Sequence, residues 1–268
     1  MTILRIDADR RWNDLARARR RRFRKPGCRP RETVYGAEPG LIPFGEAMPD
    51  QLVDPADYKS VIEHCHAQKI FPLYHQRATW APTGYQWTQN GLNFCWAWGL
   101  GASMMDCGAA EGRPTRILSP VTLGWLVRWR NSGNYLADAV RGALERGIAT
   151  MAFTPDPHDL GRKSFVEGWE ADALENRLAE AWDADTSSKA SAVRYAISIL
   201  KTGRSLYIAY DWWGHALSCC GVVWDETQPN NLIWLLRNSH DEDDVIEMTG
   251  DRAVPDEIIG IRANRIAA

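Results

Sequence analysis

The chain has 268 residues, and its 45% hydrophobic and 25% charged residues are ordinary for a soluble globular protein. No run approaches the roughly 18 apolar residues that span a bilayer, which excludes a transmembrane helix and a membrane partner. The first twelve residues lack the apolar core of a signal peptide, so we expect the chain to stay in a reducing cytoplasm with its six cysteines free.

The formal net charge of −2 conceals a basic N-terminal arm, residues 1–31. This arm holds twelve Lys or Arg and three Asp or Glu, so it carries +9 and the rest of the chain carries −11. Its densest part runs from Arg19 to Lys25, where like charges repel unless an anion neutralises them. Two interpretations stay open: a solvated tail, or a tether to nucleic acid or to an acidic protein surface.

Proline and glycine interrupt residues 32–69, which we interpret as a connector ending in a short helix near 56–67. After an aromatic loop, the apolar segment from Cys95 to Cys107 contains no proline. It predicts a helix that is buried on most faces. Ser119 followed by Pro120 predicts the start of the next helix, with Ser119 as its cap.

Further helices are expected before the pattern changes. They cover 134–146, ended by Gly147, and 188–202, whereas the acidic stretch 156–187 reads as surface loop and helix. Short apolar runs separated by turn residues then predict antiparallel strands at 205–210, 216–224 and 231–236. The sequence therefore predicts an α+β domain over 70–265, with a helical half at about 70–202 and a β half at about 203–265.

Cys95 is the candidate nucleophile. A thiol attacks an amide only as the thiolate, and an unperturbed cysteine with a pKa near 8.5 is mostly protonated at neutral pH. The positive end of a helix and a neighbouring imidazolium both lower that pKa. Cys95 stands where the buried helix should begin, so the positive end of that helix is expected to lower its pKa.

Three further residues complete the candidate catalytic set. His215 lies between two predicted strands and is flanked by aromatic residues, which would hold its ring in one orientation. Asn238 follows the last predicted strand, where its amide oxygen can orient the imidazole. Gln89 precedes Cys95 by six residues, and its amide can join backbone N–H groups in an oxyanion hole.

This set resembles the papain-like (C1-type) cysteine peptidases over roughly residues 70–265. The resemblance implies a helical subdomain packed on an antiparallel β-barrel-like subdomain, with the active-site cleft between them. It also implies hydrolysis of peptide or protein substrates by a Cys-His-Asn site with a Gln-assisted oxyanion hole, without cofactor or metal. The segments that carry it are Gln89, Cys95-Trp96-Ala97-Trp98, Gly214-His215-Ala216 and Arg237-Asn238-Ser239.

Two positions depart from the family pattern and bear on turnover more than on fold. Phe94 stands where the family usually has a small residue, and it could narrow the cleft. His240 replaces the aromatic residue that shields the Asn–His hydrogen bond, and the acidic run from Asp241 to Asp244 replaces a glycine turn.

A narrower resemblance connects the chain to papain-like proteins of tailed bacteriophages. It rests on Trp212-Trp213-Gly214-His215 and on Ala253-Val254-Pro255-Asp256. It implies a virion structural or adaptor protein that uses the fold as a docking module with weak or no activity. Assembly partners would then hold the arm, and the protein would occur in the host cytoplasm and the virion. A cell-wall amidase is a weaker alternative, because Gln89 and Asn238 fit the papain pattern better.

A metal site is not expected. His64-Cys65-His66 offers zinc ligands, but no second cluster has ligand spacing.

Overall fold

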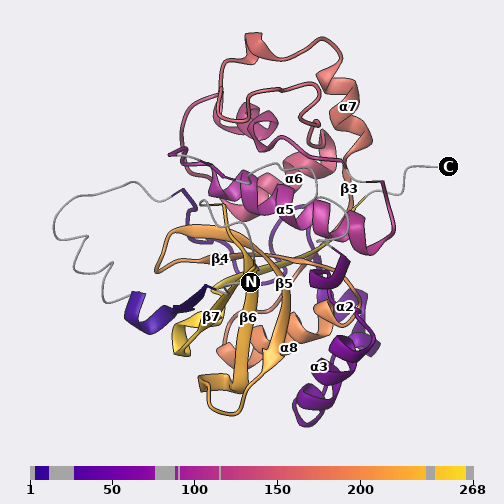
Figure 1. The fold of residues 1–268 in the computed structure, drawn as a ribbon, viewed down its shortest axis with the longest axis vertical. Helices are drawn as coiled ribbons and strands as arrows, with labels where there is room; N and C mark the ends of the chain where they lie inside the picture. Colours follow the sequence, from indigo (N-terminus) through magenta and orange to yellow (C-terminus); the bar gives the residue numbers. More distant parts are fainter. Residues whose placement is uncertain are drawn as a thin grey trace.

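The computed structural model describes residues 4–11, 27–75, 88–89, 91–114, 116–239 and 245–263. Within these ranges the strands form one eight-stranded sheet with the order β1-β7-β6-β5-β4-β8-β3-β2. The inner pairs are antiparallel, and the two edge pairs, β1 with β7 and β2 with β3, are parallel. Helices α5 and α6 lie on one side of this sheet, and α3 and α8 lie on the other (Figure 1).

The strands have the following bounds: β1 Arg5–Asp7, β2 Ile42–Pro43, β3 Leu178–Asp183, β4 Leu206–Tyr210, β5 His215–Trp224, β6 Leu232–Arg237, β7 Val245–Thr249 and β8 Glu257–Ala263. The α-helices are α2 Phe44–Ala47, α3 Tyr58–Ala67, α5 Cys95–Ala110, α6 Leu136–Glu145, α7 Trp169–Glu175 and α8 Lys189–Leu200. The 3-10 helices are η1 Pro49–Gln51, η2 Pro55–Asp57, η4 Pro120–Val127, η5 Arg162–Ser164, η6 Pro229–Asn231 and η7 Asp251–Ala253.

Helix α5 positions the candidate nucleophile, because it packs directly on β5. All its residues except Gly108 and Ala110 are buried, as its apolar composition predicts. Gly99 permits the close approach: a β-carbon built there would lie 3.0 Å from the backbone nitrogen of Leu217. A larger residue at this position would push the helix away from the strand. The packing therefore holds the start of α5 beside the start of β5.

The opposite face of the sheet is covered by α3 and α8. Their apolar residues join those of β4, β5 and β6 in a second buried cluster. The Ser188 hydroxyl caps α8 by accepting a hydrogen bond from the Ser191 backbone N–H at 3.1 Å, as expected for serine at this position. Helical packing on both faces leaves β4 and β5 fully sandwiched.

The predicted fold class is confirmed: a helical part packs on a mixed, largely antiparallel sheet. The strands predicted near 205–210, 216–224 and 231–236 correspond to β4, β5 and β6. Two local predictions were wrong. Ser119 makes no side-chain cap bond, and the helix after it is the 3-10 helix η4.

The second error is β3, which lies inside the stretch expected to be surface loop and helix. Its charged residues gave that segment a surface-like pattern, but long-range partners neutralise them. Glu180 pairs with Arg262 on β8 at 2.9 Å, and the buried Asp183 pairs with Arg31. Strands β1, β2 and β3 all come from outside the range 203–265 expected for the β half.

The basic arm is described at its two ends. Residues of β1 pair in parallel with β7, and residues 27–31 lie against the domain. The run from Arg19 to Lys25 lies outside the described residues. No helix in the described ranges is long and apolar enough to cross a membrane.

Candidate active site

Cys95 is the first residue of α5, and its side chain is 1% exposed. Its thiol lies 4.0 Å from the carbonyl oxygen of Gly214, and the nearby backbone N–H groups of Ala216 and Trp96 act on the sulfur to lower its pKa. Gly214 and Ala216 are the two neighbours of His215 in the chain. The structure therefore brings the thiol against the peptide groups on both sides of the candidate base.

His215 begins β5 and contacts Asn238, which follows β6. The His215 Nε2 atom lies 2.7 Å from Asn238 Oδ1. That oxygen also accepts the backbone N–H of Ser239 at 2.8 Å, which fixes the orientation of the amide. Because Oδ1 can only accept, the imidazole proton is assigned to Nε2, leaving Nδ1 as the nitrogen that can exchange a proton with a thiol. The Trp213 ring packs on the imidazole with its centroid 4.5 Å away.

Gln89 is hydrogen-bonded to Ser239, the residue that follows Asn238. Its backbone N–H donates to the Ser239 carbonyl at 2.8 Å, and its Oε1 accepts from the Ser239 hydroxyl at 2.6 Å. One amide hydrogen of Gln89 is donated to the Leu92 carbonyl at 2.6 Å, and the amide carries a second hydrogen that an oxyanion could accept. Ser239 thus connects Gln89 with Asn238, a role that sequence reasoning missed although Ser239 belongs to the quoted Asn-Ser segment.

Phe94, which the sequence suggested could narrow the cleft, belongs to the same buried cluster as Cys95, and its effect on an open cleft stays a prediction. Its side chain is fully buried, and its ring lies 4.9 Å from that of Trp96 in the core beneath α5. His240 and the acidic run from Asp241 to Asp244 lie outside the described residues.

Residues 27–31, here called the covering segment, lie over Cys95 where the sequence predicted an open cleft. A β-carbon built on Gly27 would be 2.8 Å from the Cys95 sulfur, so the segment lies directly on the thiol. The Cys28 N–H donates to the Gly214 carbonyl at 3.1 Å. On the other side, Asn134 donates to Gly27 O at 3.2 Å and accepts from Arg29 N–H at 3.0 Å. Backbone bonds to both sides of the domain therefore hold the segment in place.

The covering segment is not presented to the thiol as a substrate. An amide under attack must turn its carbonyl oxygen toward the donors at the start of α5. The carbonyl of Gly27 instead accepts from Asn134. The contact therefore blocks the thiol without offering it a bond to cleave.

The covered thiol is a poor nucleophile. Burial raises the pKa of Cys95 to about 12, against the smaller lowering by backbone N–H groups that include those of Ala216 and Trp96. The expectation of a lowered pKa is therefore not met in this arrangement. Desolvation is the dominant cause, and it depends on the residues that lie over the sulfur.

Glu257 is a second buried titratable group near the covering segment. It begins β8, its side chain is 3% exposed, and burial raises its pKa to about 8. Its ordinary pKa is 4.5, so between these values the folded protein holds a proton that the unfolded chain releases. The resulting stabilisation is fully present below about pH 4.5 and is lost as the pH rises through about 8.

We expect Glu257→Gln to remove this pH dependence. In the wild-type protein, each rise of one pH unit between 4.5 and about 8 lowers the free energy of unfolding by at most about 1.4 kcal/mol. Urea denaturation at pH 5, 6.5 and 8 measures it, with the exposed Glu145→Gln as control. Parallel pH profiles of the wild type and Glu257→Gln would contradict the expectation.

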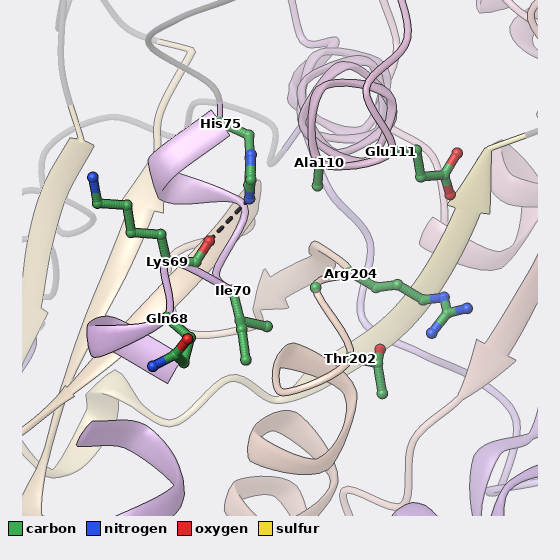
Figure 2. A pocket seen from close by; sticks show the side chains of 9 residues that line it. Gln68, Lys69, Ile70, His75, Ala110, Glu111, Thr202 and Arg204 are labelled. Carbon is green, nitrogen blue, oxygen red and sulfur yellow. Dashed lines mark hydrogen bonds between the residues drawn. The ribbon is translucent and has the colours of Figure 1, made fainter. Parts of the chain in front are cut away.

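A surface pocket of about 350 Å³ lies away from Cys95 and includes residues of α5's far end and of the loop after α8. Figure 2 shows the His75 ring directed at the Lys69 carbonyl, with Nε2 and that oxygen 2.9 Å apart. Glu111 and Arg204 lie on the other side of this pocket (Figure 2). It contains none of the four candidate catalytic residues.

The side chains of His64, Cys65 and His66 do not converge on a common point. His66 contacts the Tyr74 hydroxyl at 2.6 Å and the Val222 carbonyl at 2.8 Å. Cys65 is buried in the core. Within the part of the chain that the structure describes, no group of three His, Cys, Asp or Glu residues is arranged to hold a metal ion.

Comparison with solved structures identifies the fold. The chain superposes on digestive procathepsin L2 from Tenebrio molitor larval midgut with a TM-score of 0.61 at 13% identity, over 88% of this chain and 78% of that one. This chain has the papain-like fold. It also matches xylellain, a cysteine protease from Xylella fastidiosa, with a TM-score of 0.52 at 17% identity, over 68% and 84% of the two chains.

Two further comparisons differ in the extent of the match. Bromelain from Ananas comosus, in complex with the E64 inhibitor, matches 69% of this chain and 97% of its own length, with a TM-score of 0.50 at 14% identity. The match to procathepsin L 3 from Tenebrio molitor, with a TM-score of 0.52 at 12% identity, covers 65% of each chain. No family model matches the sequence, and no curated protein matches it. At these identities the likeness shows the fold alone.

Proposed function

We propose that this chain is a cysteine peptidase that cleaves peptide bonds at Cys95 after the covering segment moves away. The observation that carries this proposal is the contact of the Cys95 thiol with the peptide groups on both sides of His215, whose ring is oriented by Asn238 at 2.7 Å. These are the parts that thiol-dependent acyl transfer requires.

The chemistry follows from these positions. His215 Nδ1 takes the proton of Cys95, and the thiolate attacks the carbonyl carbon of the substrate. Backbone N–H groups at the start of α5 and the amide of Gln89 donate to the oxyanion. The imidazolium then protonates the leaving amine, and the acyl group remains on sulfur as a thioester. In the second half, His215 takes a proton from water, the hydroxide releases the acid, and the thiol is regenerated.

The proposal includes latency because the covering segment excludes substrate from Cys95. The segment must be displaced or cleaved before a peptide can reach the sulfur.

A substitution at Gly27 tests both the proposed activity of Cys95 and its proposed latency. Valine there would put its β-carbon 2.8 Å from the Cys95 sulfur, and overpacking of this kind costs about 1–3 kcal/mol. If the segment bears that cost, its displaced state becomes about 5-fold to 150-fold more populated. We therefore expect Gly27→Val to raise the rate of Cys95 labelling by E-64 by that factor, as measured by peptide mapping.

Gly108→Ala serves as the matched control, because its new methyl would lie 3.9 Å from the nearest atom of Arg113. It should leave the labelling rate unchanged, and Cys95→Ala should abolish it. If the thiol of Gly27→Val reacts with E-64 no faster than free cysteine does, the peptidase proposal fails.

A docking module without catalysis is the second candidate, and the covered thiol with a pKa of about 12 favours it. In this alternative the fold serves as a virion structural or adaptor component, and assembly partners or nucleic acid bind the basic arm from Arg19 to Lys25. If E-64 labels Cys95 in none of these variants, that result would support this alternative.

A further inference from the structure

Another pocket lies in the helical part of the chain, apart from Cys95. It has a volume of about 210 Å³ and includes none of the four candidate catalytic residues. Its walls come from η4 and the turn after it, from the C-terminal end of α6, from η5 and from α7. Figure 1 shows α7 beyond α6, on the side away from the sheet. A space of this size exceeds the voids that a close-packed interior leaves.

Three tryptophans give this pocket aromatic walls. The rings of Trp129 and Trp169 lie edge to face with their centroids 6.0 Å apart. The ring of Phe165 supports both, with its centroid 5.3 Å from each. Trp125 packs on α6 at Gly142, where a β-carbon would come within 3.0 Å of the indole. Walls of this kind favour a ligand that has a flat, apolar part.

The backbone at Trp129 has a conformation that a large side chain rarely adopts. Arg128 and Trp129 both have a positive φ, 54° and 58°. Gly124 makes room for the ring, since a β-carbon there would lie 2.8 Å from the Trp129 indole. Left-handed residues other than glycine are strained, and such strain is concentrated in functional sites. The chain therefore holds this ring at the pocket at a cost in backbone energy.

Two arginines line the pocket, and among the described residues only one of them has an anionic partner. Arg162 lies over the Trp169 ring at 5.8 Å and pairs with Glu170 at 3.0 Å. The Arg146 guanidinium lies over the Trp125 ring at 4.2 Å and pairs with no carboxylate that the structure describes. Stacking uses the face of a guanidinium and leaves its N–H groups, which lie in its plane, able to bind a carboxylate in a bidentate manner. One uncompensated positive charge therefore stands beside aromatic walls.

We propose that this pocket binds an aromatic carboxylate, an aromatic ring with its carboxylate a few bonds away. The ring would pack among Trp125, Trp129 and Leu174, whose side chain is 47% exposed. The carboxylate would accept two N–H groups of Arg146. One unpaired cation matches a monoanion, whereas a phosphate dianion calls for a second cation and a neutral sugar leaves the guanidinium unused. The site is separate from Cys95, so this proposal goes beyond the proposed function and does not depend on it.

The test titrates the full ¹⁵N-labelled chain with N-acetylphenylalanine and with its uncharged amide. NMR follows the indole N–H signals, which single Trp→Phe variants assign. The acid should shift the signals of Trp125, Trp129 and Trp169 with a Kd on the order of 1 mM, as a ligand of this size allows. The amide should bind at least about tenfold more weakly, because it lacks the charge-assisted hydrogen bonds.

Two variants of the full chain separate the guanidinium from the net charge of this region. Arg146→Met keeps an apolar stem over Trp125 and removes the guanidinium, so the acid and the amide should bind with Kd values within about threefold of each other. Arg130→Met removes one charge at an exposed position in the turn after η4 that does not line the pocket. It should leave both Kd values unchanged. Loss of the acid's preference in Arg130→Met as well would overturn the assignment to Arg146.

The remaining outcomes decide the class of ligand. Equal binding of the acid and the amide to the unaltered chain, or no shift of the three indole signals, overturns the proposal. Phenyl phosphate that binds about tenfold more tightly than the acid would show a dianion site and also overturns it. Titration with 3-phenylpropanoate, which lacks the peptide group, separates two sources of the same chemistry. Tighter binding of N-acetylphenylalanine supports the last residue of a peptide, and tighter binding of 3-phenylpropanoate supports a free acid.

Discussion

Replacing His215 with alanine in the Gly27→Val chain is expected to lower kcat/KM for a cleaved peptide by about 10²- to 10⁴-fold. The loss arises because the imidazole both removes the proton of Cys95 and protonates the leaving amine. Hydrolysis of a fluorogenic peptide that the Gly27→Val chain cleaves measures it. His64→Ala, on the exposed side of α3, is the control and should retain the parent rate. An unchanged rate in His215→Ala would contradict the assigned role.

Asn238→Ala should cost less than His215→Ala, because it removes the group that orients the ring and leaves the ring itself. The Asn238 oxygen accepts the Nε2 proton at 2.7 Å, so its loss allows the imidazole to turn and to change tautomer. The readout is the pH profile of kcat/KM, whose acid limb should shift in Asn238→Ala. A variant that merely loses stability would lower the rate without moving that limb.

The second large effect is expected at the anchor of the covering segment. Arg31 forms a bidentate ion pair with Asp183, whose side chain is 0% exposed. Removing one partner of such a pair leaves an uncompensated buried charge, which costs about 3–5 kcal/mol. We expect Arg31→Ala to lower the free energy of unfolding by that amount in urea denaturation, and to increase E-64 labelling of Cys95 because the segment is less firmly held.

Two comparisons with other variants test this prediction further. The double variant Arg31→Ala with Asp183→Ala should be more stable than Arg31→Ala alone, because the buried charge is gone. Arg162→Ala breaks an ion pair whose two side chains are 60% and 59% exposed, and it should cost less than about 1 kcal/mol. Equal effects of Arg31→Ala and Arg162→Ala would show that the buried pair does not anchor the segment.

The sequence alone determined the elements whose pattern is local. The apolar segment without proline around Cys95 predicts the buried helix α5, and the short runs rich in Ile, Val, Leu and Trp predict β4, β5 and β6. The four candidate site residues follow from chemistry and spacing, since Cys95 opens a helix, His215 opens a strand and Asn238 follows one. Their convergence could be expected from the resemblance to the papain-like peptidases. The roles assigned to them stay predictions.

Only the tertiary structure decided how the site is covered and what surrounds it. Residues 27–31 carry no periodicity, and their partners Asn134, Asp183 and Gly214 lie more than a hundred positions away in the chain. Strand β3 was misassigned for a related reason: Asp183 is a charged residue whose burial depends on Arg31. Likewise, the burial of Glu257, whose Oε2 atom accepts no hydrogen bond from the described residues, follows only from the pairing of β8 with β4. Local patterns report which face of an element is apolar, whereas a buried charge or a segment lying on a thiol is defined by partners that folding brings from afar.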